Sequence, residues 1–409
     1  MQKMEENMSQ VIDYFRKYIH IPSASDESTG SRPSTPGQMD MAKALEEDMR
    51  ALGLKDVRNF DNGYVWGRVP ANADGQPVIG LIAHLDVVNN EPCDPMRERV
   101  VENYGGDAIE IGSGVTLSPE EFPAMKRWKG KDLIVTDGST ILGADDKAGV
   151  AEIMALCARL MADPGMPHGE VAVAFTPDEE IGSGAEELDL EAFKADFAYT
   201  VDGGELGEVE YENFNAASAR LNFHGVSIHP GSAKNRMKNA ALMAGEFISL
   251  LPAFETPAHT EGREGFYHLV RVDATPEQAF LAYIIRDHDA LKLEEKKAYL
   301  ARCHDMINAR WGEGSCELEI RDSYRNMYEA IRPHMHVVER AAKAFEACGV
   351  TPVFPPVRGG TDGAQLSFRG LPCPNLSTGS INHHGVRECA CVQDMETMVD
   401  VLTELVRAR

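Results

Sequence analysis

Three short apolar runs, each ending in polar residues, constrain the fold most strongly. They are VIGLIAHLDVV at residues 78–88, VAVAFTP at 171–177 and FAYTVDGG at 197–204. Their length and β-branched content are typical of strands buried on both faces, and a helix-like stretch from Ala148 to Met161 separates the first two. Because strand–helix–strand alternation favours parallel pairing, the pattern predicts an α/β fold, a mostly parallel sheet with helices on both faces.

The chain changes in character near Tyr211. ASARLNFHG, YHLVRVDA and QAFLAYIIRD alternate apolar and polar residues as half-exposed strands do, and helical stretches are expected at about 236–251 and 289–310. Residues 212–327 are therefore predicted to form a smaller, inserted α+β domain, while residues 1–211 and 328–409 form one larger domain. The segment at 89–132 is rich in Gly, Pro and charge, and we expect a long loop excursion there. A cleft between two such domains is a natural place for a ligand.

The charge of the chain limits its partners. With 40 Lys and Arg against 65 Asp and Glu, the net charge is −25, which repels phosphate backbones and anionic lipid surfaces. We therefore expect neither nucleic acid nor a membrane as a partner. The eight cysteines are scattered without a metal or redox spacing, and the first residues carry acids and a helical repeat instead of the apolar core of a signal peptide. These features favour a cytoplasmic protein.

Polar residues that can hold metal follow the predicted strands. His84 and Asp86 end the first strand, where the alternation of a strand puts both on one face. An imidazole can bind a metal through one ring nitrogen while the other donates to a carboxylate, a role that suits Asp86. The alternative is a histidine that merely caps backbone groups at the end of a strand. Asp202 follows the third strand and is a further candidate.

Three more groups complete the set. Asp145 and Asp146 stand at the expected start of a helix, where capping alone would also explain them. Glu179 and Glu180 follow the second strand, so one could bind metal while the other acts as general base, unless both are surface residues. INHHGVRE near the C-terminus offers His383 and His384.

These positions share one property, because open α/β sheets bind ligands outside the carboxyl ends of their strands. Two histidines, two terminal carboxylates and one bridging carboxylate would give three ligands per ion and leave positions open for water and substrate. The residues therefore predict a two-metal hydrolase.

Longer strings carry a resemblance to a known family. IAHLDVV, TDGSTILGADDKAGVAEI, FTPDEEIGSGA, GVSIHPGSAKNRM, AYIIRDHD and RGGTDGAQLSFRGLPCPNLSTG resemble the peptidase T family of tripeptide aminopeptidases, from about residue 10 to residue 405. The resemblance implies a zinc exopeptidase fold, with residues 1–211 and 328–409 as the catalytic domain. It also implies two Zn ions per subunit, replaceable by Co or Mn. The substrates would be short peptides, chiefly tripeptides, and residues 212–327 would act as a lid and in a homodimer.

The resemblance also implies a role for each candidate residue. One zinc would be held by His84 and Asp202 and the other by Glu180 and His384, with Asp145 as the bridge. Glu179 would be the general base, and Asp86 would orient His84. His229 would polarise the scissile carbonyl or bind its oxyanion, from its own or from a second subunit, and Arg286 would pair with the carboxylate of the substrate. The peptide bond between Asp145 and Asp146 would be cis.

One departure from the family and two alternative functions stay open. The family has a single histidine before the glycine of the last motif, whereas His383 and His384 are both present here, so His383 could compete as a ligand. A dipeptidase, carboxypeptidase or acyl-amino-acid deacylase would use the same metal chemistry. A non-catalytic binding protein on this fold would have no need of Glu179.

Overall fold

The computed structural model describes residues 9–408, and they divide into two compact units. Unit 1 comprises residues up to Tyr211, Glu329–Pro355 and Thr361 onward, and unit 2 comprises Glu212–Tyr328 and Pro356–Gly360. The sequence pattern had placed residues 356–360 in the larger domain. They group with unit 2 because Val357 N donates to Glu212 O (2.9 Å) and Arg358 donates to the carbonyl oxygens of Gly262 and Thr260.

A seven-stranded sheet forms the centre of unit 1, in the order β1-β2-β8-β3-β9-β15-β10. The four strands β8, β3, β9 and β15 run parallel to one another, and antiparallel pairing occurs at β2 and at β10. The prediction of a mostly parallel sheet is therefore confirmed. The strands span Lys55–Asn59 (β1), Val65–Val69 (β2), Ile79–His84 (β3), Val171–Thr176 (β8), Phe197–Val201 (β9), Val209–Glu210 (β10) and Asn375–Leu376 (β15).

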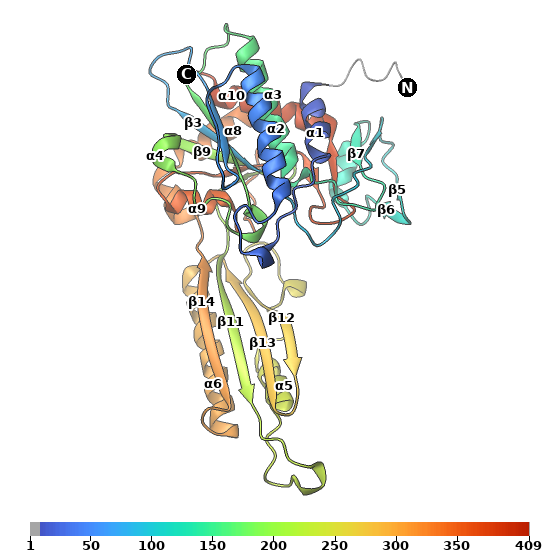
Figure 1. The fold of residues 1–409 in the computed structure, drawn as a ribbon, viewed down its shortest axis with the longest axis vertical. Helices are drawn as coiled ribbons and strands as arrows, with labels where there is room; N and C mark the ends of the chain where they lie inside the picture. The colour runs from blue at the N-terminus through green and yellow to red at the C-terminus, as the bar shows by residue number, and fades with distance from the viewer. Residues whose placement is uncertain (1–8, 409) are drawn as a thin grey trace. The chain divides into compact units, whose positions relative to one another are not determined.

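Helices cover both faces of this sheet (Figure 1). Helix α3 packs on β3 and β9 and is itself covered by α1, α2 and α10. The other face buries Trp66, Ile82 and Ala174 against Phe193 of α4 and Leu366 of α9. The helices of unit 1 span Gln10–Ile19 (α1), Pro36–Leu52 (α2), Ala144–Ala162 (α3), Leu190–Phe193 (α4), His336–Ala347 (α8), Asp362–Phe368 (α9) and Val392–Val406 (α10), and α7 (Tyr328–Ile331) starts at the unit boundary.

The segment at 89–132 is more ordered than the loop excursion that we expected. It forms short strands, and its residues Tyr104, Leu117, Met125 and Trp128 are buried in a hydrophobic cluster that residues 133–135 and 381–391 complete. Its strands join a four-stranded sheet, β16-β17-β7-β4, and a two-stranded one, β5-β6. These strands span Arg99–Val101 (β4), Ile109–Gly112 (β5), Val115–Leu117 (β6), Leu133–Val135 (β7), Ser380–Ile381 (β16) and Cys389–Cys391 (β17).

Unit 2 is a two-layer α+β structure. Its antiparallel sheet has the order β12-β13-β11-β14, and buried residues of α5 and α6 pack against one face of it, including Phe247 and Leu300. The alternation of QAFLAYIIRD reappears as alternating burial along β13. The elements span Asn215–His224 (β11), Ala240–Leu250 (α5), Phe266–Ala274 (β12), Gln278–Asp287 (β13), Ala290–Trp311 (α6) and Cys316–Tyr324 (β14).

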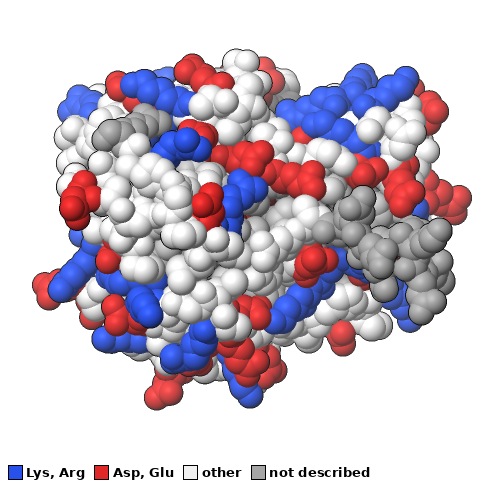
Figure 2. Space-filling model, turned by 90° about the horizontal axis from the view of Figure 1, so that it is seen from above, with Lys and Arg blue, Asp and Glu red and all other residues white. Residues whose placement is uncertain are grey.

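Charge is dispersed over the face that Figure 2 shows, where acidic and basic side chains stand among one another. Between residues 9 and 408, no helix combines the length and the apolar composition that crossing a bilayer requires.

Candidate metal centre

The candidate metal ligands come from five separate segments of unit 1. His84 is the last residue of β3, Glu180 lies in the short 3₁₀ helix that follows β8, and Asp202 comes directly after β9. Asp145 lies at the start of α3, and His384 lies in the loop between β16 and β17. Because β8, β3 and β9 are adjacent and parallel, their carboxyl ends meet at one edge of the sheet.

The ligand atoms form two groups that share Asp145. His84 Nε2 lies 3.0 Å from Asp145 Oδ1 and 3.5 Å from Asp202 Oδ1. His384 Nε2 lies 3.2 Å from Asp145 Oδ2 and 3.1 Å from Glu180 Oε1. In each group all ligand atoms lie within 4.8 Å of one another. The arrangement could hold two cations, with one oxygen of Asp145 turned to each.

The electrostatics of the two groups fit cations as well. Burial raises the pKa of Glu180 to about 7, and hydrogen bonds to Asp145 and Glu180 raise the pKa of His384 to about 11. Burial would also raise the pKa of Asp145, but hydrogen bonds from His384 and His84 hold it well below its usual range. The carboxylates thus favour the protonated form of His384. Divalent cations would supply the same positive charge while the imidazoles stayed neutral.

Asp86 contacts both His84 and the Glu179–Glu180 turn. Its carboxylate accepts the backbone N–H groups of Glu179 (3.0 Å) and Glu180 (3.2 Å), and it is completely buried. His84 Nδ1 lies 3.0 Å from the backbone oxygen of Asp86 and 3.4 Å from its carboxylate. The structure therefore brings Asp86 to His84 as predicted, but with the peptide carbonyl as the nearer acceptor. Asp86 also holds the Glu179–Glu180 turn, which the sequence did not indicate.

Two further buried carboxylates hold the chain around Asp145. Asp146 accepts the backbone N–H of His84 (3.1 Å) and that of Gly149 (3.3 Å), and the Asp145–Asp146 peptide bond is cis, as the resemblance implied. Glu388 accepts the backbone N–H groups of Gly143 (2.6 Å) and Asp145 (2.9 Å). Sequence reasoning missed Glu388. Its one signal was its place four residues after His384.

Glu179, the expected general base, begins the same 3₁₀ turn as Glu180. Burial raises its pKa well above the usual range, and the negative charges of Asp362, Asp202 and Glu180 act in the same direction. A carboxyl group with a raised pKa is suited to accept a proton and to give it up again near neutral pH. Its role as a base stays a prediction.

His383 and His384 have different environments. His384 belongs to the second ligand group, whereas His383 Nε2 lies 2.8 Å from Ser380 Oγ, and His383 Nδ1 lies 3.9 Å from Asp145 Oδ2. Of the two histidines, the geometry therefore favours His384 as the metal ligand.

His229 and Arg286 belong to unit 2. His229 is exposed, and its Nδ1 accepts the backbone N–H of Gly231 (3.2 Å). Arg286 donates through Nη1 to the carbonyl oxygen of Arg358 (2.8 Å), while its buried Nε has no hydrogen-bond partner within residues 9–408. The guanidinium also lies over the ring of Tyr324. Their roles in substrate binding stay predictions.

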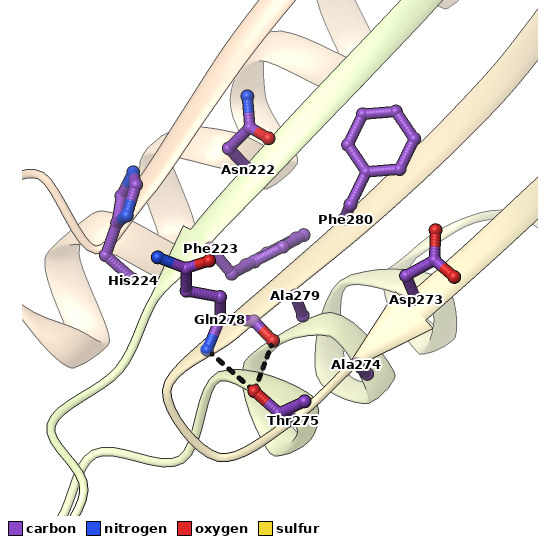
Figure 3. A pocket seen from close by; sticks show the side chains of 9 residues that line it. All are labelled: Asn222, Phe223, His224, Asp273, Ala274, Thr275, Gln278, Ala279 and Phe280. Carbon is purple, nitrogen blue, oxygen red and sulfur yellow. Dashed lines mark hydrogen bonds between the residues drawn. The ribbon is translucent and has the colours of Figure 1, made fainter.

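A hollow of ≈ 320 Å³ in unit 2 holds no comparable set of ligands (Figure 3). It is lined by residues of β11, β12 and β13, and His224 and Asp273 lie on opposite sides of it. Thr275 and Gln278 hydrogen-bond to each other at the turn between β12 and β13. Among residues 9–408, both candidate groups of metal ligands lie in unit 1.

Comparisons with known proteins place the chain in a family. A peptidase T of Halothermothrix orenii is 48% identical over 402 residues, which cover 98% of each chain. The chain belongs to the peptidase T family. It is accordingly an enzyme, a metal-dependent aminopeptidase, as the motifs predicted.

Solved structures and a domain family extend the comparison. The aminopeptidase PepT of Bacillus cereus matches with a TM-score of 0.77 and 22% identity, covering 97% of both chains. A Bacillus subtilis protein described as a dinuclear metal-binding peptidase of the M20 family matches with a TM-score of 0.63 and 15% identity, covering 97% of this chain and 96% of the other. Residues 211–314 match a family described as a peptidase dimerisation domain. These matches confirm the predicted exopeptidase fold.

Proposed function

We propose that this member of the peptidase T family hydrolyses the N-terminal peptide bond of tripeptides in the cytoplasm. The observation that carries the proposal is the pair of ligand groups that share Asp145 beside Glu179. In this proposal His84 and Asp202 would hold one zinc ion, Glu180 and His384 would hold the other, and Co or Mn could substitute. When bound, two such ions would supply the Lewis acidity that activates a water molecule and polarises the substrate carbonyl.

The protein's own residues carry the proton and hold the geometry. Glu179 takes a proton from the attacking water and passes it to the amine of the leaving dipeptide, which its raised pKa supports. Asp86 holds the general base and two of the metal ligands in place. It accepts the N–H groups of Glu179 and Glu180 and lies beside His84 Nδ1. The side chains thus need little rearrangement when the substrate arrives.

Unit 2 is the proposed source of substrate contacts and of the dimer. Arg286 would pair with the C-terminal carboxylate of the tripeptide through its fork of N–H donors, and its unpaired buried Nε supports this role. His229 would bind the oxygen of the scissile carbonyl. The match to a dimerisation domain over residues 211–314 supports a homodimer through unit 2, with residues 1–211 and 328–409 as the catalytic part.

An assay of the purified protein with Leu-Gly-Gly, with and without a chelator, tests the function. Free leucine should appear, the chelator should stop its release, and added zinc should restore it. Leu-Gly, an N-acetylated amino acid and N-acetylated Leu-Gly-Gly serve as comparison substrates and should react much more slowly. Faster cleavage of Leu-Gly or of the acetylated amino acid would assign the chain to the dipeptidase or deacylase alternatives.

A further inference from the structure

A hollow of ≈ 470 Å³ lies in unit 1, next to the candidate metal centre. Three segments line it: residues 121–124 within the ordered excursion, residues 204–208 after β9, and residues 380–383 at β16. Asp202 stands two residues before the second of these segments, and His384 directly follows the third. Two of the segments that line the hollow therefore lead directly to candidate metal ligands.

The ring of His383 belongs to the hollow and lies beside the metal centre. It lines the hollow, and its Nδ1 lies 3.9 Å from Asp145 Oδ2. Ser380 holds the far ring nitrogen at 2.8 Å, and Thr378 in turn lies 2.8 Å from Ser380. A Cβ at Gly203 would come within 3.2 Å of the ring, so the imidazole packs on bare backbone there. His383 is therefore fixed as a wall residue one position before the ligand His384.

We propose that this hollow binds the side chain of the substrate's N-terminal residue. The inference rests on the proposed function. In any aminopeptidase substrate the first Cα is bonded directly to the scissile carbonyl carbon, at about 1.5 Å. When that carbonyl lies at the metal centre, the first side chain must enter a space beside the centre, and the hollow lined by His383 is such a space.

The charge around the hollow indicates which end of the peptide it receives. Glu121, Glu205 and Glu208 line it, and Arg127 pairs with Glu205 at 2.7 Å. The remaining negative charge attracts the free ammonium group of the substrate and repels its C-terminal carboxylate. Phe122 provides apolar surface. We therefore expect a preference for long apolar or basic N-terminal residues over acidic ones.

Filling the hollow tests its assignment. Ala124 is a partly buried residue that lines the hollow. Ala124→Phe should therefore lower the ratio of kcat/KM for Met-Gly-Gly to kcat/KM for Ala-Gly-Gly by about tenfold or more. This is the effect expected when a side chain of several methylenes is excluded from a pocket. The matched control is Ala71→Phe, at an exposed alanine outside the hollow, which should leave the ratio unchanged. Ala124→Leu repeats the test if the larger side chain prevents folding. The Kd values of the same peptides with a reduced first peptide bond, measured by calorimetry, should change in parallel.

A second variant tests the charge. Glu121→Gln should lower the preference for Lys-Gly-Gly over norleucine-Gly-Gly by roughly two- to fivefold, as expected for an exposed charge. A Met-to-Ala ratio that stays within about twofold of wild type in a folded Ala124 variant would overturn the inference alone. Failure of the wild-type protein to cleave any tripeptide would overturn the proposed function itself.

Discussion

At the scale of single residues, a variant of Glu179 can distinguish the loss of catalysis from the loss of metal. Because it is assigned no metal, Glu179→Ala should reduce kcat by about 10²–10⁴, the usual contribution of a general base, while the protein keeps both ions. Metal content per subunit by mass spectrometry, alongside kcat for Leu-Gly-Gly, checks this. If both zinc ions are lost together with activity, the roles of Glu179 and Glu180 are exchanged or shared.

The neighbouring histidines allow a matched pair of variants. His384 lies 3.1 Å from Glu180 and 3.2 Å from Asp145, whereas His383 is bonded to Ser380. His384→Ala should therefore lower the zinc content toward one ion per subunit, because one of three ligands is removed. His383→Ala should retain both ions. The reverse order of zinc loss would show that His383 is the ligand.

A buried carboxyl group outside the metal centre predicts a pH dependence of stability. Glu152 of α3 is fully buried, and neither of its carboxylate oxygens has a hydrogen-bond partner within the described chain. Burial raises its pKa well above 4.5, and the charge of Asp394 adds to the shift. Above about pH 4.5 the carboxyl group of Glu152 therefore keeps its proton in the folded state and loses it in the unfolded state. For this reason Glu152 makes the free energy of unfolding decrease as the pH rises.

Glu152→Gln removes this dependence, since glutamine does not ionise. The variant should gain stability over wild type as pH rises from about 5 to about 8, by up to about 1.4 kcal/mol per pH unit within the titration window. Urea unfolding midpoints of both proteins at several pH values measure the difference. Parallel curves would mean that Glu152 is ionised and paired in the folded protein.

At the scale of elements, the contact between α3 and β9 positions Asp145 and Asp202. A Cβ at Gly149 of α3 would lie 1.8 Å from the carbonyl oxygen of Val201, so the helix approaches the strand as only glycine allows. Gly149→Ala should destabilise unit 1 by about 1–3 kcal/mol or more and weaken zinc binding.

The same substitution elsewhere provides the control. At Gly245 of α5 a Cβ meets nothing within 4 Å, so Gly245→Ala should stabilise its helix by about 0.5–1 kcal/mol. Unfolding midpoints in urea and zinc affinity by competition with a chelator compare the two variants. Equal effects at both positions would contradict the close approach of α3 to β9.

The same elements show what the sequence could and could not predict. Apolar runs of strand length mark β3, β8 and β9, and the parallel sheet follows from their alternation with helices. The strands of the excursion are only three or four residues long, too short for a periodicity to appear. Their core depends on Trp128 and Met125, which lie in a polar segment of sequence.

The candidate site divides in the same way. His84, Glu180 and Asp202 could be found because each follows a buried run, and the rule on strand ends places them together. The support from Glu388 was missed, since it accepts the N–H of Asp145 across 243 positions of sequence. No local sequence pattern joins two residues so far apart.

At the scale of the whole molecule, the proposed reaction needs both units. The metal centre lies in unit 1 and Arg286 in unit 2, so Arg286→Ala should leave the zinc content unchanged. It should reduce kcat/KM for tripeptides by an amount equivalent to about 2–5 kcal/mol, the effect of leaving a buried carboxylate unpaired. It should also reduce the difference in kcat/KM between Leu-Gly-Gly and its C-terminal amide. A variant that still discriminates fully against the amide would show that another group, such as Arg358, binds the C-terminus.

The wide spacing of the ligands along the chain also matters while the protein is being made. Asp145 is shared by both groups, but His84 and His384 stand 300 positions apart, and Glu388 follows still later. Synthesis runs from the N-terminus, so a growing chain on the ribosome contains His84, Asp145 and Asp202 long before it contains His384. The backbone of this first group is also held by late residues, because Asp145 N donates to Glu388 and Asp202 N donates to Leu376 O. In the proposed function, peptide hydrolysis must therefore wait until the C-terminal residues have been made.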